Sequence, residues 1–588
     1  MKELDYPLDT KQILQNHKKI RKQLLKQENL IEKRIAILSG STIGIIKNIL
    51  ELFLLNNQIK PYFWVGNYNC FYEDIMFENM ELINFKPDII YIHTTSRNLR
   101  IPNIDNYDEE LNELINKYQD MWNKIEKLYN CIIIQNNFEM LPYRIIGNYS
   151  AYSDSGNLNF IRLLNNKLYD YAISKKNIII HDINYLSAWF GLEKWFDPNL
   201  WYSYKYAMSM NAIPSLCFNL ANIIKAIYGK NKKALILDLD NTLWGGIIGD
   251  DGIEKIQIGN GTPLGMLYMD FQRYIKQLGK YGILLNICSK NEEKSAKEGL
   301  AHSEGILREE DFLIIKANWL DKHENVKSII KELNILDDSV VFIDDNPAER
   351  DEVKFFLPHI KILDVTSPEQ FITYLDHSGF FEVISYSKED KERYKYYKDN
   401  ISRGKSRNLY IDYNDYLISL KMKCFIKRIN SYNYERVTQL INKTNQFNFT
   451  SIRYTENEMK ELLTKESYIT ITSRLVDKYG DNGLVSTLIA TVYGEEANIN
   501  LWVMSCRVFK RNLEYTMFDV FIEECKKRNI QWINGYYRPT NKNNQIKNFF
   551  ETLGFELFST SEKEDWWKYE IPNNYIYKNT VMEVIIDG

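Results

Sequence analysis

The sequence holds little that would support a secreted, disulfide-bonded or membrane-spanning protein. It has seven cysteines in 588 residues, and no two of them form a Cys-x-x-Cys pair, so neither a disulfide framework nor a structural zinc site is expected. Long apolar runs are missing too, because segments such as Ile35–Leu38 and Ala234–Leu237 fall far short of a membrane span. The first residues lack the apolar core of a signal peptide. These absences predict a cytoplasmic protein without a membrane partner.

No charge of one sign dominates the chain. Lys and Arg number 74 against 78 Asp and Glu, for a net charge of −4, which gives no reason to expect nucleic acid as a partner. Hydrophobic residues make up 45% and charged residues 26%, as in ordinary globular proteins. At about 150 residues per domain, the length predicts three or four domains.

Two stretches of the chain alternate short apolar segments with amphipathic, helix-like segments. Such alternation predicts α/β domains with parallel sheets. The expected organisation is a helical lead-in at 1–34, a first domain at 35–228, a second at 232–385, a linker at 386–420 and a third domain at 421–576. Strands are expected in the second domain at Ala234–Leu237, Ile283–Ile287, Phe312–Ile315, Val340–Ile343 and Ile360–Leu363. Strands are expected in the third at Cys424–Ile429, Tyr468–Ser473, Ser486–Tyr493, Ile499–Val503 and Ile530–Tyr536.

The clearest chemical signal follows the first strand of the second domain, which runs into Asp238-Leu-Asp240-Asn-Thr242. In an open parallel sheet, ligands bind at the carboxyl ends of the strands. Alternate residues of an extended segment face the same way, so Asp238 and Asp240 are both expected to face that crevice. Two carboxylates there can divide the work of phosphate transfer, one as nucleophile and the other as proton carrier.

Two later strands of the same domain also end in polar residues suited to phosphate. The segment Ser289-Lys290-Asn291 follows one strand and offers donors for phosphate oxygens. Lys322 follows the next strand and can offset phosphate charge.

A fourth strand ends in the paired acids Asp344 and Asp345. With Asp238 they form a candidate Mg²⁺ site, because this hard cation takes carboxylate oxygens and water. Each motif alone also has a structural explanation, since Asp-x-Asp often caps a helix and Asp-Asp before Asn-Pro can form a turn. Four such motifs in order favour phosphate transfer.

These motifs resemble the haloacid-dehalogenase (HAD) superfamily. The resemblance implies Asp238 as nucleophile, Asp240 as general acid and base, and Lys322 as stabiliser of the phosphoryl group. The spacing leaves no room for an inserted cap domain, so an open site is expected. The other implied roles are phosphoryl binding by Thr242 and Ser289, and Mg²⁺ binding by Asp238, the carbonyl of Asp240, Asp344 and Asp345.

Longer stretches narrow the resemblance to subfamily IIIC and to the FkbH-like family. They are Asp238–Gly246, Cys288–Asn291, Leu307–Phe312, Phe342–Arg350, Lys443–Asn448, Asp477–Val485 and Ser505–Val508. Members of that family take the glyceryl group of 1,3-bisphosphoglycerate, remove its phosphates and load D-glycerate on an acyl carrier protein. The resemblance therefore implies Mg²⁺ as cofactor and the phosphopantetheine arm of a carrier protein as partner. Further candidates are Lys290, Asn291 and Arg350 for phosphate, and Asn445 and Gln446 for the carrier.

The flanking domains resemble two other folds. In the first, Ser39-Gly-Ser41 resembles the nucleophile turn of SGNH esterases, but Leu200 stands where their catalytic His would fall. Without a base a serine is a poor nucleophile, so an SGNH-like α/β domain without hydrolase activity is expected.

In the third domain, Cys506–Arg511 and the helix after it resemble the acetyl-CoA-binding turn of GNAT acyltransferases, which binds pyrophosphate at a helix N-terminus. Lys510 and Asn512 stand where Gly would be expected, which puts CoA binding in doubt. The implied fold class is α/β with three domains: an SGNH-like α/β domain, a capless HAD domain with a parallel sheet, and a GNAT-like α+β domain.

Two thiols are candidates for carrying the acyl group. Cys288 lies near its strand end beside the expected phosphate site, and it either holds the glyceryl group or is a small buried hydrophobe. Cys506 is the second candidate. Beside it Arg507, Lys510 and Arg511 either grip a phosphate or phosphopantetheine arm or form a solvated helix start.

The predicted function is glyceryl transfer from 1,3-bisphosphoglycerate to an acyl carrier protein, with dephosphorylation, in polyketide or related biosynthesis. Two alternatives remain open. One is a Mg²⁺-dependent phosphatase acting on another phosphorylated metabolite. The other is a non-enzymatic scaffold that docks carrier proteins.

Overall fold

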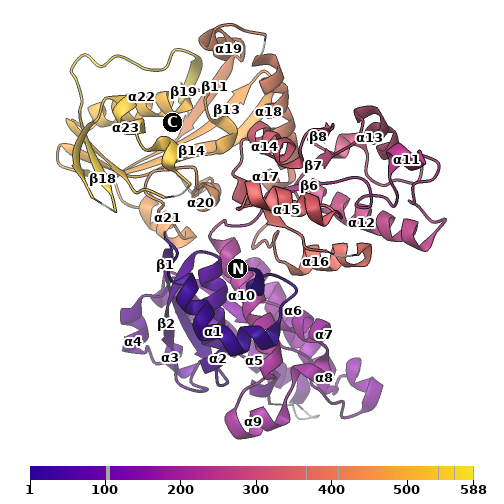
Figure 1. Ribbon diagram of the computed structural model, residues 1–588. Helices are drawn as coiled ribbons and strands as arrows, with labels where there is room; N and C mark the ends of the chain where they lie inside the picture. Colours follow the sequence, from indigo (N-terminus) through magenta and orange to yellow (C-terminus); the bar gives the residue numbers. More distant parts are fainter. Residues whose placement is uncertain are drawn as a thin grey trace. The chain divides into compact units, whose positions relative to one another are not determined.

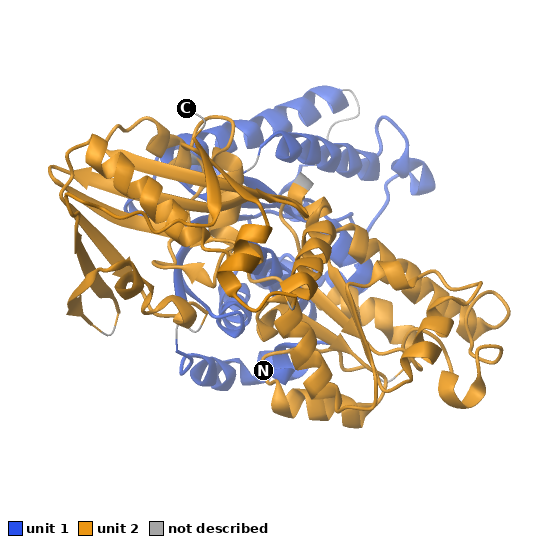
Figure 2. Cartoon of the chain, turned by 90° about the horizontal axis from the view of Figure 1, so that it is seen from above, with its two compact units in different colours: residues 1–227 blue, residues 228–588 orange. Residues whose placement is uncertain are grey.

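The chain folds into two compact units, residues 1–227 and 228–588, which Figure 2 colours separately. The computed structural model describes residues 1–586 except 29, 101–105, 176, 366, 408, 541 and 562. Within these residues, none of the helices combines the length and apolar character that a membrane crossing requires. The predicted α/β fold class is confirmed, because two of the three sheets are wholly parallel.

Unit 1 is built on a five-stranded parallel sheet (Figure 1). Its strands, in spatial order, are β2 (Ile59–Val65), β1 (Ile31–Ser39), β3 (Ile89–His93), β4 (Ile132–Asn136) and β5 (Ile178–His181). All five residues of β3 are buried, as expected for a strand covered by helices on both faces. Helices α5 (Tyr107–Leu128) and α6 (Asn157–Ser174) pack on one face.

The first sheet of unit 2 is also parallel and carries the acidic motifs. Its spatial order is β10 (Lys361–Ile362), β9 (Val340–Ile343), β6 (Ala234–Leu237), β7 (Leu284–Ser289) and β8 (Ile314–Ala317). Helices α12 (Pro263–Lys280) and α13 (Glu293–Leu300) pack on one face, and α14 (Lys322–Leu333) and α15 (Pro347–Phe356) on the other. Since β6 is central, the loop after it lies between the loops after β9 and β7.

The second sheet of unit 2 is mixed and larger. Its order is β17 (Glu556–Thr560), β18 (Asp565–Glu570), β16 (Trp532–Tyr537), β15 (Glu496–Met504), β14 (Gly480–Tyr493), β13 (Tyr468–Asp477), β11 (Met422–Lys427) and β19 (Met582–Ile586), and β12 (Phe447–Asn448) pairs with β15. Helix α22 (Leu513–Lys527) contributes much of the core on this sheet. The segment expected to be a linker forms helices α18 (Arg393–Arg407) and α19 (Tyr413–Ser419).

Candidate phosphate-transfer site

A buried lysine and two carboxylates meet at one edge of the parallel sheet in unit 2, where strands β6, β8 and β9 end. Asp238 follows β6, Asp344 follows β9, and Lys322 is the first residue of α14, after β8. The Lys322 Nζ lies 2.8 Å from Asp238 Oδ1 and 2.6 Å from Asp344 Oδ2. The Lys322 side chain is only 3% exposed and that of Asp344 is fully buried, so these charges interact in a medium that screens them weakly.

Burial and neighbouring charge compete at this cluster. Burial lowers the pKa of Lys322, but the carboxylates of Asp238 and Asp344 outweigh it and raise the pKa above its ordinary value. Burial raises the pKa of Asp344 to about 6, with Lys322 opposing the shift. Burial and Asp238 likewise raise the pKa of Asp345. Three carboxyl groups thus share one lysine, and a further cation would favour their charged forms.

Carboxylate oxygens of Asp238, Asp344 and Asp345 lie within 4.8 Å of one another. This spacing and this donor type suit a hard divalent cation such as Mg²⁺. Arg350 holds the loop that carries two of these acids, because its Nη1 donates to the carbonyls of Asp344 at 2.9 Å and Asp345 at 2.7 Å. The structure thus places the expected phosphate ligand Arg350 beneath the loop, as a positioning residue.

Asp240 is held by three donors. Its Oδ1 accepts from the Trp244 indole at 2.9 Å and from the Ile248 amide at 3.1 Å, and its Oδ2 accepts from Asn291 Nδ2 at 2.8 Å. The same amide group lies 3.2 Å from Ser289 Oγ. Asn291 therefore links the end of β7 to the loop after β6. The sequence motif contained Trp244, but nothing in the pattern indicated that its indole orients the carboxylate.

Thr242 and Lys290, both expected to bind phosphate, have different surroundings. The Thr242 hydroxyl is buried and has no hydrogen-bond partner among the described residues, so it remains available to a ligand. Lys290 forms an ion pair with Glu349 at 2.9 Å, with its side chain 32% exposed. That pairing turns part of its charge away from the acidic cluster.

The side chain of Cys288 faces the core instead of the acidic cluster. It is fully buried among apolar residues of the α14 side of the sheet, while Ser289 points the other way. Its Sγ contacts the Lys322 carbonyl at 3.7 Å, and burial raises its pKa to about 12. Since the thiolate is the nucleophile, this environment disfavours the expected role of Cys288 as an acyl carrier.

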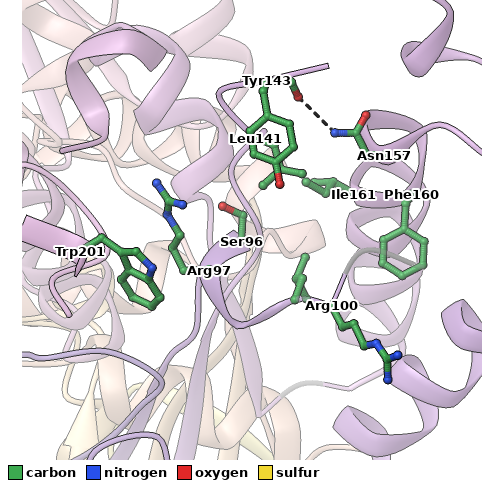
Figure 3. Close-up of a pocket in the computed structure, with 10 residues that line it drawn as sticks. Ser96, Arg97, Arg100, Leu141, Tyr143, Asn157, Phe160, Ile161 and Trp201 are labelled. Carbon is green, nitrogen blue, oxygen red and sulfur yellow. Dashed lines mark hydrogen bonds between the residues drawn. The ribbon is translucent and has the colours of Figure 1, made fainter. Parts of the chain in front are cut away.

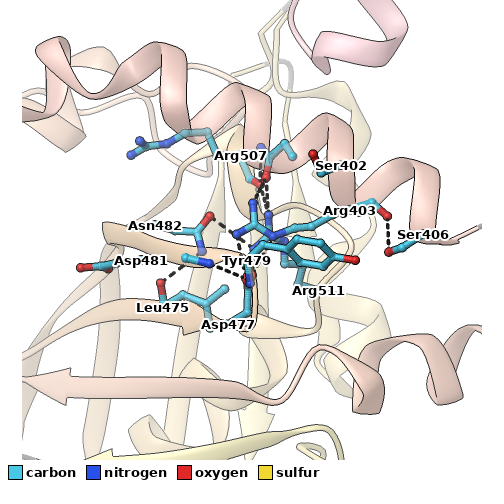
Figure 4. A network of polar contacts seen from close by, with 12 residues as sticks. Ser402, Arg403, Ser406, Leu475, Asp477, Tyr479, Asp481, Asn482, Arg507 and Arg511 are labelled. Atoms are coloured by element: carbon cyan, nitrogen blue, oxygen red, sulfur yellow. Dashed lines mark hydrogen bonds and ion pairs between the residues drawn. The ribbon is translucent and has the colours of Figure 1, made fainter. Parts of the chain in front are cut away.

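The turn before α22 has an unusual backbone at the two positions where Gly was expected. Lys510 has φ +62° and Asn512 has φ +60°, in the left-handed region that favours Gly. Arg511, between them, is 6% exposed and forms an ion pair with the buried Asp477 at 2.9 Å. Arg403 of α18 binds the same carboxylate with two bonds of 2.8 Å (Figure 4). Arg511 thus anchors the turn and does not extend toward a ligand.

The other candidates for handling the acyl group lie near the same turn or at β12. Cys506 is half-buried, and its Sγ lies 3.9 Å from the Tyr397 hydroxyl. The Arg507 guanidinium stacks 4.5 Å from the centre of the Tyr396 ring. Asn445 accepts a hydrogen bond from Arg453. Gln446 is half-buried immediately before β12.

In unit 1 the Ser41 hydroxyl is buried and has no hydrogen-bond partner among the described residues. Asp197, which precedes the missing histidine position, caps a short helix through the amides of Asn199 and Leu200. The loss of hydrolase activity in this unit stays a prediction.

Comparisons with known proteins found one family model and several solved structures that are similar to parts of the chain. Residues 34–225 match the family model described as FkbH, N-terminal domain. No curated protein sequence matches the chain. The solved N-terminal part of the protein BF1531 from Bacteroides fragilis, which contains a phosphatase domain and is complexed with Mg, is similar at 29% identity and a TM-score of 0.59. That alignment covers 63% of this chain and 99% of the BF1531 chain.

Two acetyltransferase structures align with part of the chain at low similarity. The ribosomal-protein-S18-alanine N-acetyltransferase from Escherichia coli is 14% identical, with 26% of this chain and 99% of that chain covered and a TM-score of 0.21. The PaiA N-acetyltransferase from Thermoplasma acidophilum is 11% identical, with coverages of 25% and 99% and a TM-score of 0.22. The resemblance to the FkbH-like family is confirmed by the family model and the BF1531 structure, and so is the expectation of a phosphatase-type enzyme.

Proposed function

We propose that this enzyme transfers the D-glyceryl group of 1,3-bisphosphoglycerate to the thiol of an acyl carrier protein and removes the remaining phosphate. In the transfer, the carrier thiol attacks the acyl carbon. The carbon–sulfur bond forms as the bond to the phosphate oxygen breaks, and the thiol proton leaves with inorganic phosphate. Hydrolysis of the 3-phosphate then releases a second phosphate and leaves D-glyceryl on the carrier.

The ion pairs of the Lys322 ammonium with the carboxylates of Asp238 and Asp344 are the main support for this proposal. In the hydrolysis, the Asp238 carboxylate attacks phosphorus and the leaving oxygen takes a proton from Asp240. Asp240 then accepts a proton from the water that hydrolyses the aspartyl phosphate. The three donors on Asp240 hold it in one orientation for both steps.

The donor set also supports a metal. A Mg²⁺ ion held by Asp238, Asp344 and Asp345, with the carbonyl of Asp240, would neutralise charge on the phosphate oxygens. Lys322 adds a fixed positive charge 2.8 Å from Asp238, and the hydroxyl of Thr242 adds a donor. The protein groups therefore bind and orient a phosphoryl group before any reaction begins.

The buried Cys288 favours direct transfer from the acyl phosphate to the carrier thiol. With its pKa raised to about 12, only about one Cys288 in 10⁵ would be ionised at neutral pH. The phosphopantetheine arm supplies its own thiol, so no enzyme thioester is needed. The proposal also assigns Mg²⁺ as the cofactor and an acyl carrier protein as the partner. It places the reaction in polyketide or related biosynthesis.

The decisive experiment incubates the enzyme with 1,3-bisphosphoglycerate, Mg²⁺ and a phosphopantetheinylated carrier protein. Intact-protein mass spectrometry detects glyceryl on the carrier, and a phosphate assay follows release. Asp238→Asn keeps the side-chain shape but removes the attacking charge, so hydrolysis of the 3-phosphate should fall by orders of magnitude. Asp250→Asn makes the same chemical change at an exposed position of α11 (Ile248–Asp251) and should leave the rate unchanged.

The results separate the proposal from its alternatives. Phosphate release without glyceryl on the carrier would indicate a phosphatase for another metabolite. Equal phosphate release by Asp238→Asn and wild type would exclude the assigned nucleophile.

A further inference from the structure

Unit 1 contains a cavity that glyceryl transfer does not use. Its volume is about 200 Å³, and it lies beyond the carboxyl ends of β3 and β4, the sheet edge where open α/β folds bind ligands. In Figure 3, Arg97 and Trp201 lie to one side of Ser96, and Phe160 and Ile161 of α6 lie to the other. An engineered protein cavity of about 150 Å³ holds a benzene molecule, so this cavity has room for a ligand of similar size.

Arg97 lines this cavity together with Arg100, and its charge acts on the buried carboxyl of Glu139. Its guanidinium carbon lies 5.0 Å from the centre of the Phe196 ring and 5.5 Å from that of Trp201, which holds it against two aromatic faces. Its Nε is buried without a hydrogen-bond partner among the described residues. Because a partly desolvated and unsatisfied guanidinium is costly, this position favours an anionic ligand.

A buried carboxyl group holds Ser96, one of the residues that line the cavity. Glu139 is fully buried and accepts hydrogen bonds from the Ser96 amide at 3.1 Å and the Ser96 hydroxyl at 3.0 Å. Burial raises the pKa of Glu139 to about 7 despite these bonds, so its negative charge is weakened near neutral pH. Ser96 and the neighbouring Arg97 are thus positioned by an interior contact, which preorganises the site.

We propose that this cavity binds a short-chain carboxylate of about six or seven non-hydrogen atoms, with the carboxylate on Arg97. A planar guanidinium matches a carboxylate in bidentate geometry. The apolar side chains of Leu141, Phe160 and Trp201 line the space available to a carbon chain. The site is independent of the proposed glyceryl transfer.

The test compares butyrate with butyramide, which has the same number of heavy atoms but no charge. Both are titrated into the full-length protein by ligand-observed NMR, with inorganic phosphate as a third probe. Butyrate should bind saturably in the millimolar range, and butyramide should bind at least about tenfold more weakly. Hydrogen exchange in residues 94–100 should slow in butyrate and not in butyramide.

Variants locate the site. Arg97→Gln should weaken butyrate binding at least about tenfold, whereas Arg21→Gln should not change it. Arg21 is a matched control, since it loses the same charge but pairs with Glu51. Equal binding of acid and amide by the wild type would overturn the proposal even if Arg97→Gln failed to fold. Absence of saturable butyrate binding, or tighter Arg97-dependent binding of phosphate, would also overturn it.

Discussion

Replacing Lys322 with Met tests whether the acidic cluster is balanced by this lysine and by a metal. Methionine keeps much of the side-chain volume but removes the charge 2.8 Å from Asp238 and 2.6 Å from Asp344. Breaking a buried ion pair by removing one partner costs about 3–5 kcal/mol, because the remaining charge is left uncompensated. Metal-free Lys322→Met should therefore lose roughly that much stability in unit 2.

Mg²⁺ should return part of the loss. A divalent cation on the three carboxylates adds positive charge where the variant lacks it, so the variant should gain more stability from Mg²⁺ than the wild type does. The effect on catalysis is separate, because the fixed charge beside the phosphoryl group is gone. Phosphate release should fall about 10²–10³-fold even with Mg²⁺ present.

The assay is urea-dependent hydrogen exchange, read in peptides spanning 234–244 and 340–350, with EDTA or with Mg²⁺. Lys290→Met is the control, since its ion pair with Glu349 is 32% exposed on the lysine side and should contribute at most about 1 kcal/mol. The reasoning would be refuted if the free energy of unfolding of Lys322→Met in EDTA were within about 1 kcal/mol of that of the wild type. It would also be refuted if Mg²⁺ did not reduce the stability difference between the two proteins.

Four further outcomes follow from the structure. Glu139 has its pKa raised from 4.5 to about 7, so folding favours its protonated form. Unit 1 should lose about 3 kcal/mol of stability as pH rises from 4.5 to 7, and Glu139→Gln should flatten that dependence in hydrogen-exchange measurements. Arg511→Met leaves Asp477 with one guanidinium partner and should cost about 1.5–3 kcal/mol in urea unfolding of unit 2, while an unchanged midpoint would contradict the anchoring role. Cys288→Ser should keep carrier loading in the mass-spectrometric assay, and loss of loading in a folded variant would restore the thiol to the mechanism. Ser41→Ala should leave glyceryl transfer intact, and a folded variant without turnover would show that this serine takes part.

The strands of the two parallel sheets were predictable because helices bury them on both faces. Buried strands are short continuous apolar runs, and β6 matches the expected Ala234–Leu237 while β9 matches Val340–Ile343. The edge strand β17 of the mixed sheet lacks such an apolar run. All five residues of β17 are exposed, so its sequence has no apolar periodicity from which a strand could be inferred. Pairing with β18 forms this strand.

The identity of the candidate site residues was predictable, but their orientation was not. Parallel strands end at one edge of the sheet, so polar residues after β6, β7 and β9 were bound to converge there. The direction of a side chain changes from one residue of a strand to the next. Cys288 and Ser289 are neighbours on β7, yet one lies in the core and the other beside Asn291. Arg350 was assigned to phosphate from its motif, whereas its guanidinium binds the carbonyls of the loop itself.

The turn before α22 follows a left-handed path at two positions that are not Gly. Lys510 and Asn512 adopt the left-handed backbone that Gly would allow without cost. Such conformations cost about 1–3 kcal/mol each for other residues and persist only where the surroundings impose them. Contacts of Arg511, which lies between these two residues, impose the conformation here. Its guanidinium binds Asp477 at 2.9 Å and Asn400 at 2.6 Å. A buried ion pair therefore keeps this backbone path in place where Gly is absent.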